Sequence, residues 1–71
     1  MSDNVYGVTE IVGSSSSSVG DAIQNAVSTA SETVRNLEWF EVVSMRGHIE
    51  DGKVAHFQVT LKIGFRYDKS R

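Results

Sequence analysis

The chain has 71 residues, with seven basic and nine acidic side chains, a formal net charge of −2 and no cysteine. Its length allows one domain, residues 1–71, and the missing cysteines exclude disulfides and thiolate metal sites. No basic stripe is present, which argues against a nucleic-acid partner, and no apolar stretch approaches the roughly 20 residues that span a bilayer.

The small size also bears on stability. A core from so short a chain contributes only roughly 3–5 kcal/mol, and two histidines, His48 and His56, are too few for a closed zinc site. We therefore expect a homo-oligomer. The N-terminus lacks the basic and apolar segments of a signal peptide, so we expect a cytoplasmic protein without a membrane partner. Residues 1–4 and 68–71 are expected to be flexible tails.

The first predicted element is a strand over residues 5–12. It has two apolar sides, because Tyr6, Val8 and Val12 alternate with Val5 and Ile11. Five consecutive serines at residues 14–18 follow it. We interpret this run as a loop between the strand and a helix, although serine runs also occur in flexible linkers.

A helix is predicted to begin after the serine run. Ser18, followed three residues later by Asp21, resembles a capping box with aspartate in place of the usual glutamate. Apolar residues then recur at the i, i+3, i+4, i+7 spacing of one helix face over residues 19–37. Alanines are frequent in this stripe, so another element can approach it closely. The stripe consists of Val19, Ala22, Ile23, Ala26, Val27, Ala30, Val34 and Leu37.

Residues 38–50 and 54–67 are predicted to be two strands joined by Asp51-Gly52, a strong signal for a two-residue type I′ hairpin. In that register Gly64 lies opposite Trp39, and both face away from the helix, whereas Phe40 and Val42 face the helix.

Met45 would lie opposite Gln58, and Val43 would join them on the face with Trp39. Such an aromatic and aliphatic patch should be covered by another subunit, a ligand, or both. The same register places His48 and His56 on opposite faces. A bulge at Gly47 or Gly64 would change the direction of Arg46.

Several segments of the chain closely resemble the dodecins. The likeness covers residues 5–67, and its motifs are Val-Thr-Glu-Ile-Val-Gly-Ser at 8–14, Leu-Glu-Trp-Phe-Glu-Val at 37–42, Arg-Gly-His at 46–48, Val-Ala-His-Phe-Gln-Val-Thr-Leu-Lys at 54–62 and Gly-Phe-Arg at 64–66. The resemblance implies an α+β domain in the order β-α-β-β. Its three-stranded antiparallel sheet wraps around one helix, and twelve copies form a hollow dodecamer.

Dodecins are small flavin-binding proteins, so the resemblance also implies roles for single residues. Flavins bind there as stacked pairs between tryptophans of neighbouring subunits, and that tryptophan matches Trp39. The glutamine that hydrogen-bonds the polar edge of the ring matches Gln58. The arginine associated with the flavin side chain and phosphate matches Arg46, and Met45 is expected beside Gln58. Several bacterial members also bind coenzyme A, with a looser match to Tyr6, Arg35, Arg66 and Tyr67.

Some positions depart from the family pattern or allow a simpler role. Gly7 stands where relatives often carry a basic residue; we keep it as a cofactor-binding position, but it weakens the expected phosphate or coenzyme A contact. Gly20 stands where relatives often carry an acidic residue. Arg46 and Arg66 also suit ion pairs at the rim of a subunit interface. Trp39 itself also suits a core or interface position.

The resemblance implies binding, storage and buffering of FMN, riboflavin or FAD, with Trp39 quenching flavin photochemistry by electron transfer. The alternative is an oligomeric structural or interaction module without a cofactor, in which the patch is wholly a subunit interface. We do not expect an enzyme, because Glu38 and Glu41 lie on opposite faces and the sequence has no nucleophile–base pair, phosphate loop or dinucleotide fingerprint. A flavin reductase would need such a nicotinamide site.

Overall fold

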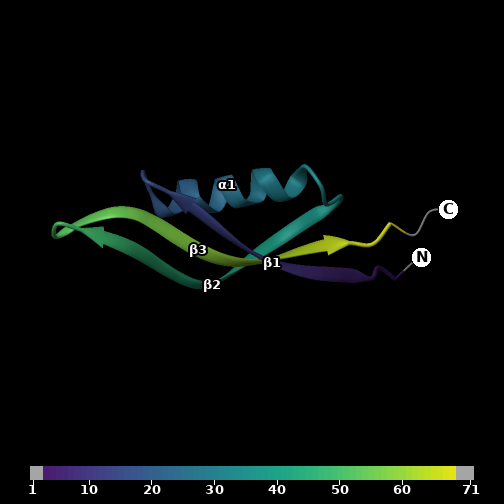
Figure 1. Ribbon diagram of the computed structural model, residues 1–71. Helices are drawn as coiled ribbons and strands as arrows, with labels where there is room; N and C mark the ends of the chain where they lie inside the picture. The colour runs from purple at the N-terminus through teal and green to yellow at the C-terminus, as the bar shows by residue number, and fades with distance from the viewer. Residues whose placement is uncertain (1–2, 69–71) are drawn as a thin grey trace.

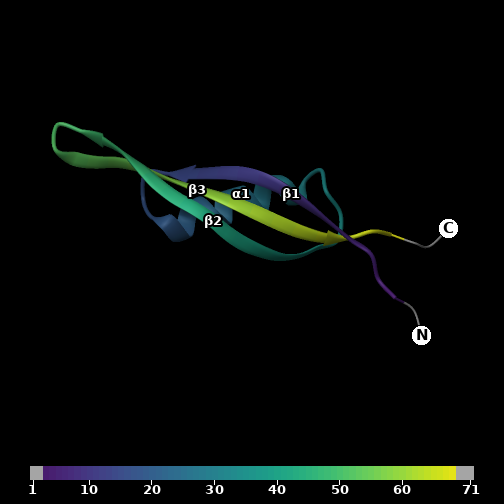
Figure 2. The same ribbon diagram turned by 90° about the horizontal axis from the view of Figure 1, so that it is seen from below.

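The computed structural model describes residues 3–68 and has one helix and three strands (Figure 1). In chain order these are β1 (Tyr6–Ser15), α1 (Val19–Ser31), β2 (Leu37–Glu50) and β3 (Lys53–Arg66). The strands form one antiparallel sheet in the order β1-β3-β2. The helix lies along one face of this sheet, and the view from below shows the other face uncovered (Figure 2). The predicted α+β class and the order β-α-β-β are confirmed.

The serine run is an ordered connection from β1 to α1. The hydroxyl of Ser15 accepts hydrogen bonds from the backbone N–H groups of Ser17 (2.9 Å) and Ser18 (3.3 Å). Ser18 is the N-cap, and its Oγ accepts a hydrogen bond from the backbone N–H of Asp21 at 3.0 Å. The predicted helix start is therefore confirmed, whereas the predicted loop begins too early, because β1 continues to Ser15.

The apolar stripe predicts a helix that extends to Leu37, but α1 ends at Ser31, so this prediction is wrong. Val34 and Leu37, the last two residues of the stripe, lie outside the helix. Thr33 and Val34 are β-branched and favour helix less than alanine does. Asn36 then takes a left-handed backbone conformation with φ of 65°, which turns the chain so that Leu37 begins β2.

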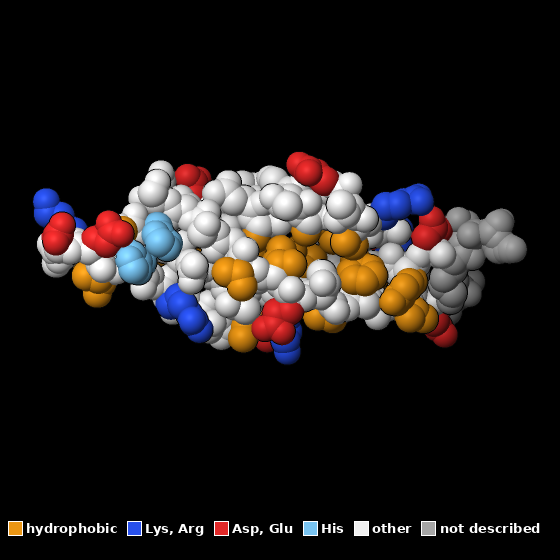
Figure 3. Space-filling model, viewed as in Figure 1, with side chains coloured by type: hydrophobic (Ala, Val, Ile, Leu, Met, Phe, Trp, Pro, Cys, Tyr) orange, Lys and Arg blue, Asp and Glu red, His pale blue; other side chains and the backbone are white. Residues whose placement is uncertain are grey.

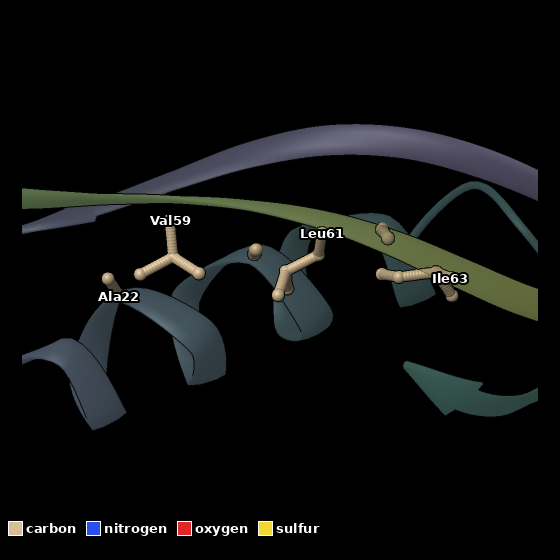
Figure 4. Packing of buried hydrophobic residues seen from close by; sticks show 6 residues of the cluster. Ala22, Val59, Leu61 and Ile63 are labelled. Carbon is tan, nitrogen blue, oxygen red and sulfur yellow. The ribbon is translucent and has the colours of Figure 1, made fainter. Parts of the chain in front are cut away.

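The core is thin and lies between α1 and β3. Three alanines of the helix face three large side chains of the central strand, so helix and sheet approach closely (Figure 4). Gly13 on β1 lets the helix come equally near, since a Cβ there would lie 2.1 Å from the carbonyl oxygen of Ala22. The buried residues are Ala22, Ala26, Ala30, Val59, Leu61 and Ile63.

The hairpin turn is the one predicted, with positive φ at Asp51 (51°) and Gly52 (75°). The register beyond it shifts three times, between His48 and Ile49, between Val42 and Ser44, and between Leu37 and Trp39. Ala55 is the extra residue on β3 at the first shift, and Val43 and Glu38 are the extra residues on β2 at the others. The predicted register assumes no bulge and is therefore wrong over part of β2; the shift at Glu38 lies opposite the step from Gly64 to Phe65.

These shifts move the side chains of residues 44–48 to the other face of the sheet, and they also pair Leu37 with Phe65. Trp39 still pairs with Gly64 and Phe40 with Ile63, as predicted, because the bulges at Ala55 and Val43 cancel. Between them, however, Arg46 pairs with Gln58 instead of Phe57, and Met45 pairs with Val59. The predicted position of Met45 opposite Gln58 is therefore wrong.

The molecule is elongated, with extents of 56 × 20 × 14 Å. The β2–β3 hairpin projects beyond the helix at one end, and the two termini lie together at the other (Figure 1). Of the tails expected to be flexible, residues 1–2 and 69–71 lie outside the described range. Asp68 contacts Arg35 through an ion pair of 3.3 Å.

Candidate functional site

The sheet face opposite α1, here called the outward face, carries most of the candidate residues. Directly opposed residues of an antiparallel sheet share a face, so its side chains form rows across the strands. From the end with the termini to the hairpin end, the rows are Tyr6–Arg66, Val8–Gly64–Trp39, Glu10–Lys62–Glu41, Val12–Thr60–Ser44, Ser14–Gln58–Arg46 and His56–His48.

Trp39 lies over Gly64, at the aromatic end of the outward face. A Cβ on Gly64 would lie 2.1 Å from Cε2 and Cζ2 of the indole, so the ring occupies the volume that a side chain would fill. The indole thus fills the space that the missing side chain of Gly64 leaves. The indole remains 43% exposed. An exposed indole on a rigid strand is a platform on which a planar ligand can stack.

Tyr6 holds the indole from the side. The two ring centroids are 5.2 Å apart with an interplanar angle of 64°, an edge-to-face contact across β3. Because Tyr6 and Gly64 both contact the indole, the orientation of Trp39 is fixed by two neighbours. The sequence match assigns Tyr6 to a coenzyme A contact, whereas the structure places it directly beside the platform.

Gln58 and Arg46 form a second, polar cluster at the other end of the outward face. They are cross-strand partners, and Ser14 lies opposite Gln58 on its other side. Gln58 is half-buried, and Arg46 is exposed. Gly64 is six positions after Gln58 along β3, a distance of about 20 Å at the rise of an antiparallel strand.

The prediction of an aromatic and aliphatic patch that runs from Trp39 to Gln58 is wrong. The row Glu10–Lys62–Glu41 lies between the platform and Gln58. Met45 faces the helix side, where it lines a hollow near the hairpin with Val19 and Phe57. The sequence contains no signal for the changed direction of Met45, because the bulge falls at Ala55 within an ordinary Val-Ala-His segment.

Three further candidates lie together at the end with the termini. Arg35, Arg66 and Tyr67 line one open groove of about 370 Å³, which also includes Phe65 and Asp68. Each arginine there has an acidic partner: Nη1 of Arg66 lies 2.7 Å from Oε2 of Glu38, and Arg35 contacts Asp68. Sequence reasoning did not identify these partners, because Glu38 and Arg66 are far apart along the chain.

Gly7 faces the helix side of the sheet, opposite Phe65. A Cβ at Gly7 would lie 2.5 Å from Cζ of Phe65 and 3.1 Å from Cε2 of Tyr67. These two rings contact each other edge-to-face with centroids 5.4 Å apart. The absence of a side chain at Gly7 therefore makes room for an aromatic pair that forms part of the groove wall.

The positions of the two histidines also differ from the prediction. His48 and His56 were expected on opposite faces, but the bulge at Ala55 makes them direct cross-strand partners. Their rings are stacked with centroids 5.3 Å apart and an interplanar angle of 16°.

The fold and the position of Trp39 together define a small α+β protein with an exposed indole on its sheet. The sequence profile of the family described as Dodecin matches residues 5–68. A curated relative, Dodecin of Thermus thermophilus, is 42% identical over 66 residues, which cover 93% of this chain and 96% of that protein.

Solved structures are similar over the same range. The dodecin from Streptomyces davaonensis gives a TM-score of 0.92 at 53% identity and covers 96% of this chain and all of its own (100%). Dodecin from Streptomyces coelicolor gives 0.91 at 57% identity, covering 99% of this chain and 100% of its own. The chain belongs to the dodecin family. Within residues 3–68, the helix α1 lacks the length and apolar character needed to cross a membrane.

Proposed function

We propose that this protein binds flavin (FMN, riboflavin or FAD) by stacking the isoalloxazine ring on Trp39. The observation that supports this best is the indole itself, held over Gly64 and against Tyr6 while 43% exposed. Ring stacking on an aromatic side chain contributes roughly 1–3 kcal/mol, by analogy with nucleobases. A platform whose orientation is already fixed loses little conformational entropy when the ligand binds.

The complete site takes residues from more than one subunit. Trp39 and Gln58 of one chain are separated by about 20 Å along β3, which exceeds the length of an isoalloxazine ring system. If Gln58 hydrogen-bonds the ring that Trp39 stacks on, the two residues come from different chains. A two-fold contact uses the same surface twice, so it brings two indoles and two glutamines together. We infer a homo-oligomer, and in particular the hollow dodecamer that the family resemblance implies.

Phosphate-bearing parts of the ligand would meet the arginines. Arg46 lies beside Gln58 and is exposed, and its guanidinium fork suits the phosphate of FMN. The groove lined by Arg35, Arg66 and Tyr67 is the proposed place for coenzyme A. Binding there would require the phosphates to compete with Glu38 and Asp68 for the two guanidinium groups.

Storage and buffering of flavin, with quenching of its photochemistry by Trp39, fit this arrangement better than catalysis. An indole stacked on a flavin can donate an electron to the excited ring and thereby quench its fluorescence. Glu38, one of the two carboxylates considered for acid–base chemistry, forms an ion pair with Arg66. That carboxylate is therefore engaged as a structural partner of the groove rather than as an acid or base.

The test is a titration of FMN with the assembled protein, followed by flavin fluorescence. We expect quenching at micromolar protein, and we expect Trp39→Ala to lose binding by at least about tenfold, since 1.4 kcal/mol of stacking corresponds to a factor of ten.

Tyr67→Ala is the matched aromatic control, because it lies on the other side of the sheet, and it should retain quenching. Normal assembly size with no quenching in the unaltered protein would favour the module without a cofactor. Full quenching by Trp39→Ala would show that the platform lies elsewhere.

A further inference from the structure

The histidine pair near the hairpin end lies on the outward face, in the row next to Gln58 and Arg46 and far from the Trp39 platform. His48 and His56 are opposed across β2 and β3, with stacked rings whose centroids are 5.3 Å apart. Figure 3 shows the two side chains in pale blue, next to each other at the projecting end of the molecule. Gly64, beneath Trp39, is eight positions after His56 along β3, a distance of about 27 Å at the rise of an antiparallel strand.

This arrangement suits chelation of a metal ion by two nitrogens. Neutral imidazole is the commonest metal ligand in proteins, and a metal–nitrogen bond is about 2.0–2.1 Å long. Two nitrogens on one ion are thus roughly 3 Å apart. Opposed Cβ atoms are about 4.5–5.5 Å apart. Small rotations of the rings can therefore bring one nitrogen from each ring to the same ion. The His48 side chain is 55% exposed, so those rotations meet little obstruction.

Glu50 provides a second and independent feature of such a site. Its Oε2 lies 3.4 Å from Nε2 of His48. A carboxylate next to one ring nitrogen favours the tautomer with the proton on that nitrogen, and it leaves the lone pair of Nδ1 available. Metal-binding histidines usually have such a partner, which fixes the ring and makes it more basic.

We propose that His48 and His56 form a two-nitrogen chelating site for a borderline divalent transition-metal ion, namely Cu²⁺, Ni²⁺ or Zn²⁺. Within residues 3–68, no group of three or more histidine, cysteine, aspartate or glutamate side chains could hold a metal ion. Water therefore completes the coordination, and the metal is exchangeable. Hard cations such as Ca²⁺ and Mg²⁺ prefer oxygen ligands and should not bind to the pair.

The experiment is a calorimetric titration of the assembled protein with each metal chloride, together with electron paramagnetic resonance of the Cu²⁺ form. Cu²⁺ should bind more tightly than Ni²⁺ or Zn²⁺. The spectrum should show coupling to two imidazole nitrogens. Loss of a residue that only supports a metal ligand already costs about 10–100-fold, so His48→Gln and His56→Gln should each weaken binding by at least about tenfold.

Two comparisons make the outcome decisive. Trp39→Ala should leave metal affinity unchanged while removing flavin quenching. A failure of the metal proposal can therefore be told apart from a failure of the flavin proposal. Light scattering should show the same assembly size for the histidine variants as for the unaltered protein. Equal metal affinity in the unaltered protein and in a variant with both His48→Gln and His56→Gln would overturn the proposal. A Cu²⁺ spectrum that shows coupling to a single nitrogen would also overturn it.

Discussion

Trp39 depends on two neighbours that are far from it in the sequence. Gly64 provides the surface beneath the indole, and the ring of Tyr6 contacts it edge-to-face with centroids 5.2 Å apart. A tryptophan on an exposed strand would otherwise sample several rotamers. The missing Cβ of Gly64 is thus as important for the platform as the indole, because any side chain there would occupy the ring's place.

Gly64→Ala tests this dependence. The new Cβ would lie 2.1 Å from two ring atoms and 2.4 Å from Cδ2, so the indole must leave its position. We expect flavin affinity to fall by about tenfold or more, as for the loss of one stacking contact. The measurement is the FMN fluorescence titration, supported by near-ultraviolet circular dichroism of Trp39. Gly20→Ala is the matched control, since the nearest atom to its Cβ is 3.9 Å away. Unchanged affinity in Gly64→Ala would contradict this role.

Among the elements, the hairpin shows most clearly how far sequence reasoning extends. Asp51-Gly52 determines the turn, and counting from it gives the correct partner for Trp39. That success depends on two bulges that cancel, at Ala55 and Val43. Neither residue is a glycine or otherwise marked, because a bulge forms where the packing of a whole sheet favours it and not where one residue requires it.

The errors at the site have the same cause. Between the two bulges the register is one residue off, so Met45 and Arg46 exchange faces. A shift of one residue moves every side chain in a segment to the other side of a sheet. The same shift brings His48 next to His56. Residue counting places Arg46 and Gln58 on opposite faces, whereas the structure makes them cross-strand partners.

The packing of α1 on β1 provides a prediction at this scale. A Cβ at Gly13 would lie 2.1 Å from the carbonyl oxygen of Ala22 and 2.8 Å from Cβ of Ala26, both on the helix. Gly13→Ala therefore requires α1 to move away from the sheet, and we expect a loss of about 1–3 kcal/mol, as for other overpacked cores. Thermal unfolding at a fixed protein concentration measures it, because oligomer stability depends on concentration.

Gly20→Ala again serves as the control. It lies within α1 with open space around its Cβ, and alanine favours helix over glycine by about 1 kcal/mol. We expect this variant to unfold at the same or a higher temperature. If Gly13→Ala also unfolds at an unchanged temperature, close contact between α1 and β1 does not limit stability.

At the scale of the whole molecule, the helix covers too little of the sheet for a lone chain. It packs against β1 and β3, so the helix-facing side chains of β2 beyond Leu37 stay open to solvent. Phe40 and Val42 point to that side as predicted, yet they are 49% and 44% exposed. Figure 3 shows hydrophobic side chains gathered between the helix and the lower edge of the sheet. A surface of this kind is typical of a subunit interface.

Val42→Lys tests whether this surface joins subunits. A lysine opposite Leu61 would place a charge in a contact that excludes water, and burying an unpaired charge costs several kcal/mol. We expect the assembly to dissociate, which sedimentation velocity would detect as a shift to small species. Flavin quenching should fall with it, because Trp39 and Gln58 of one chain are too far apart to bind one ring. Gln24→Lys, on the exposed side of α1, adds the same charge and should leave both properties unchanged. A dissociated Val42→Lys that still quenches flavin fully would mean that one chain carries a complete site, contrary to the spacing along β3.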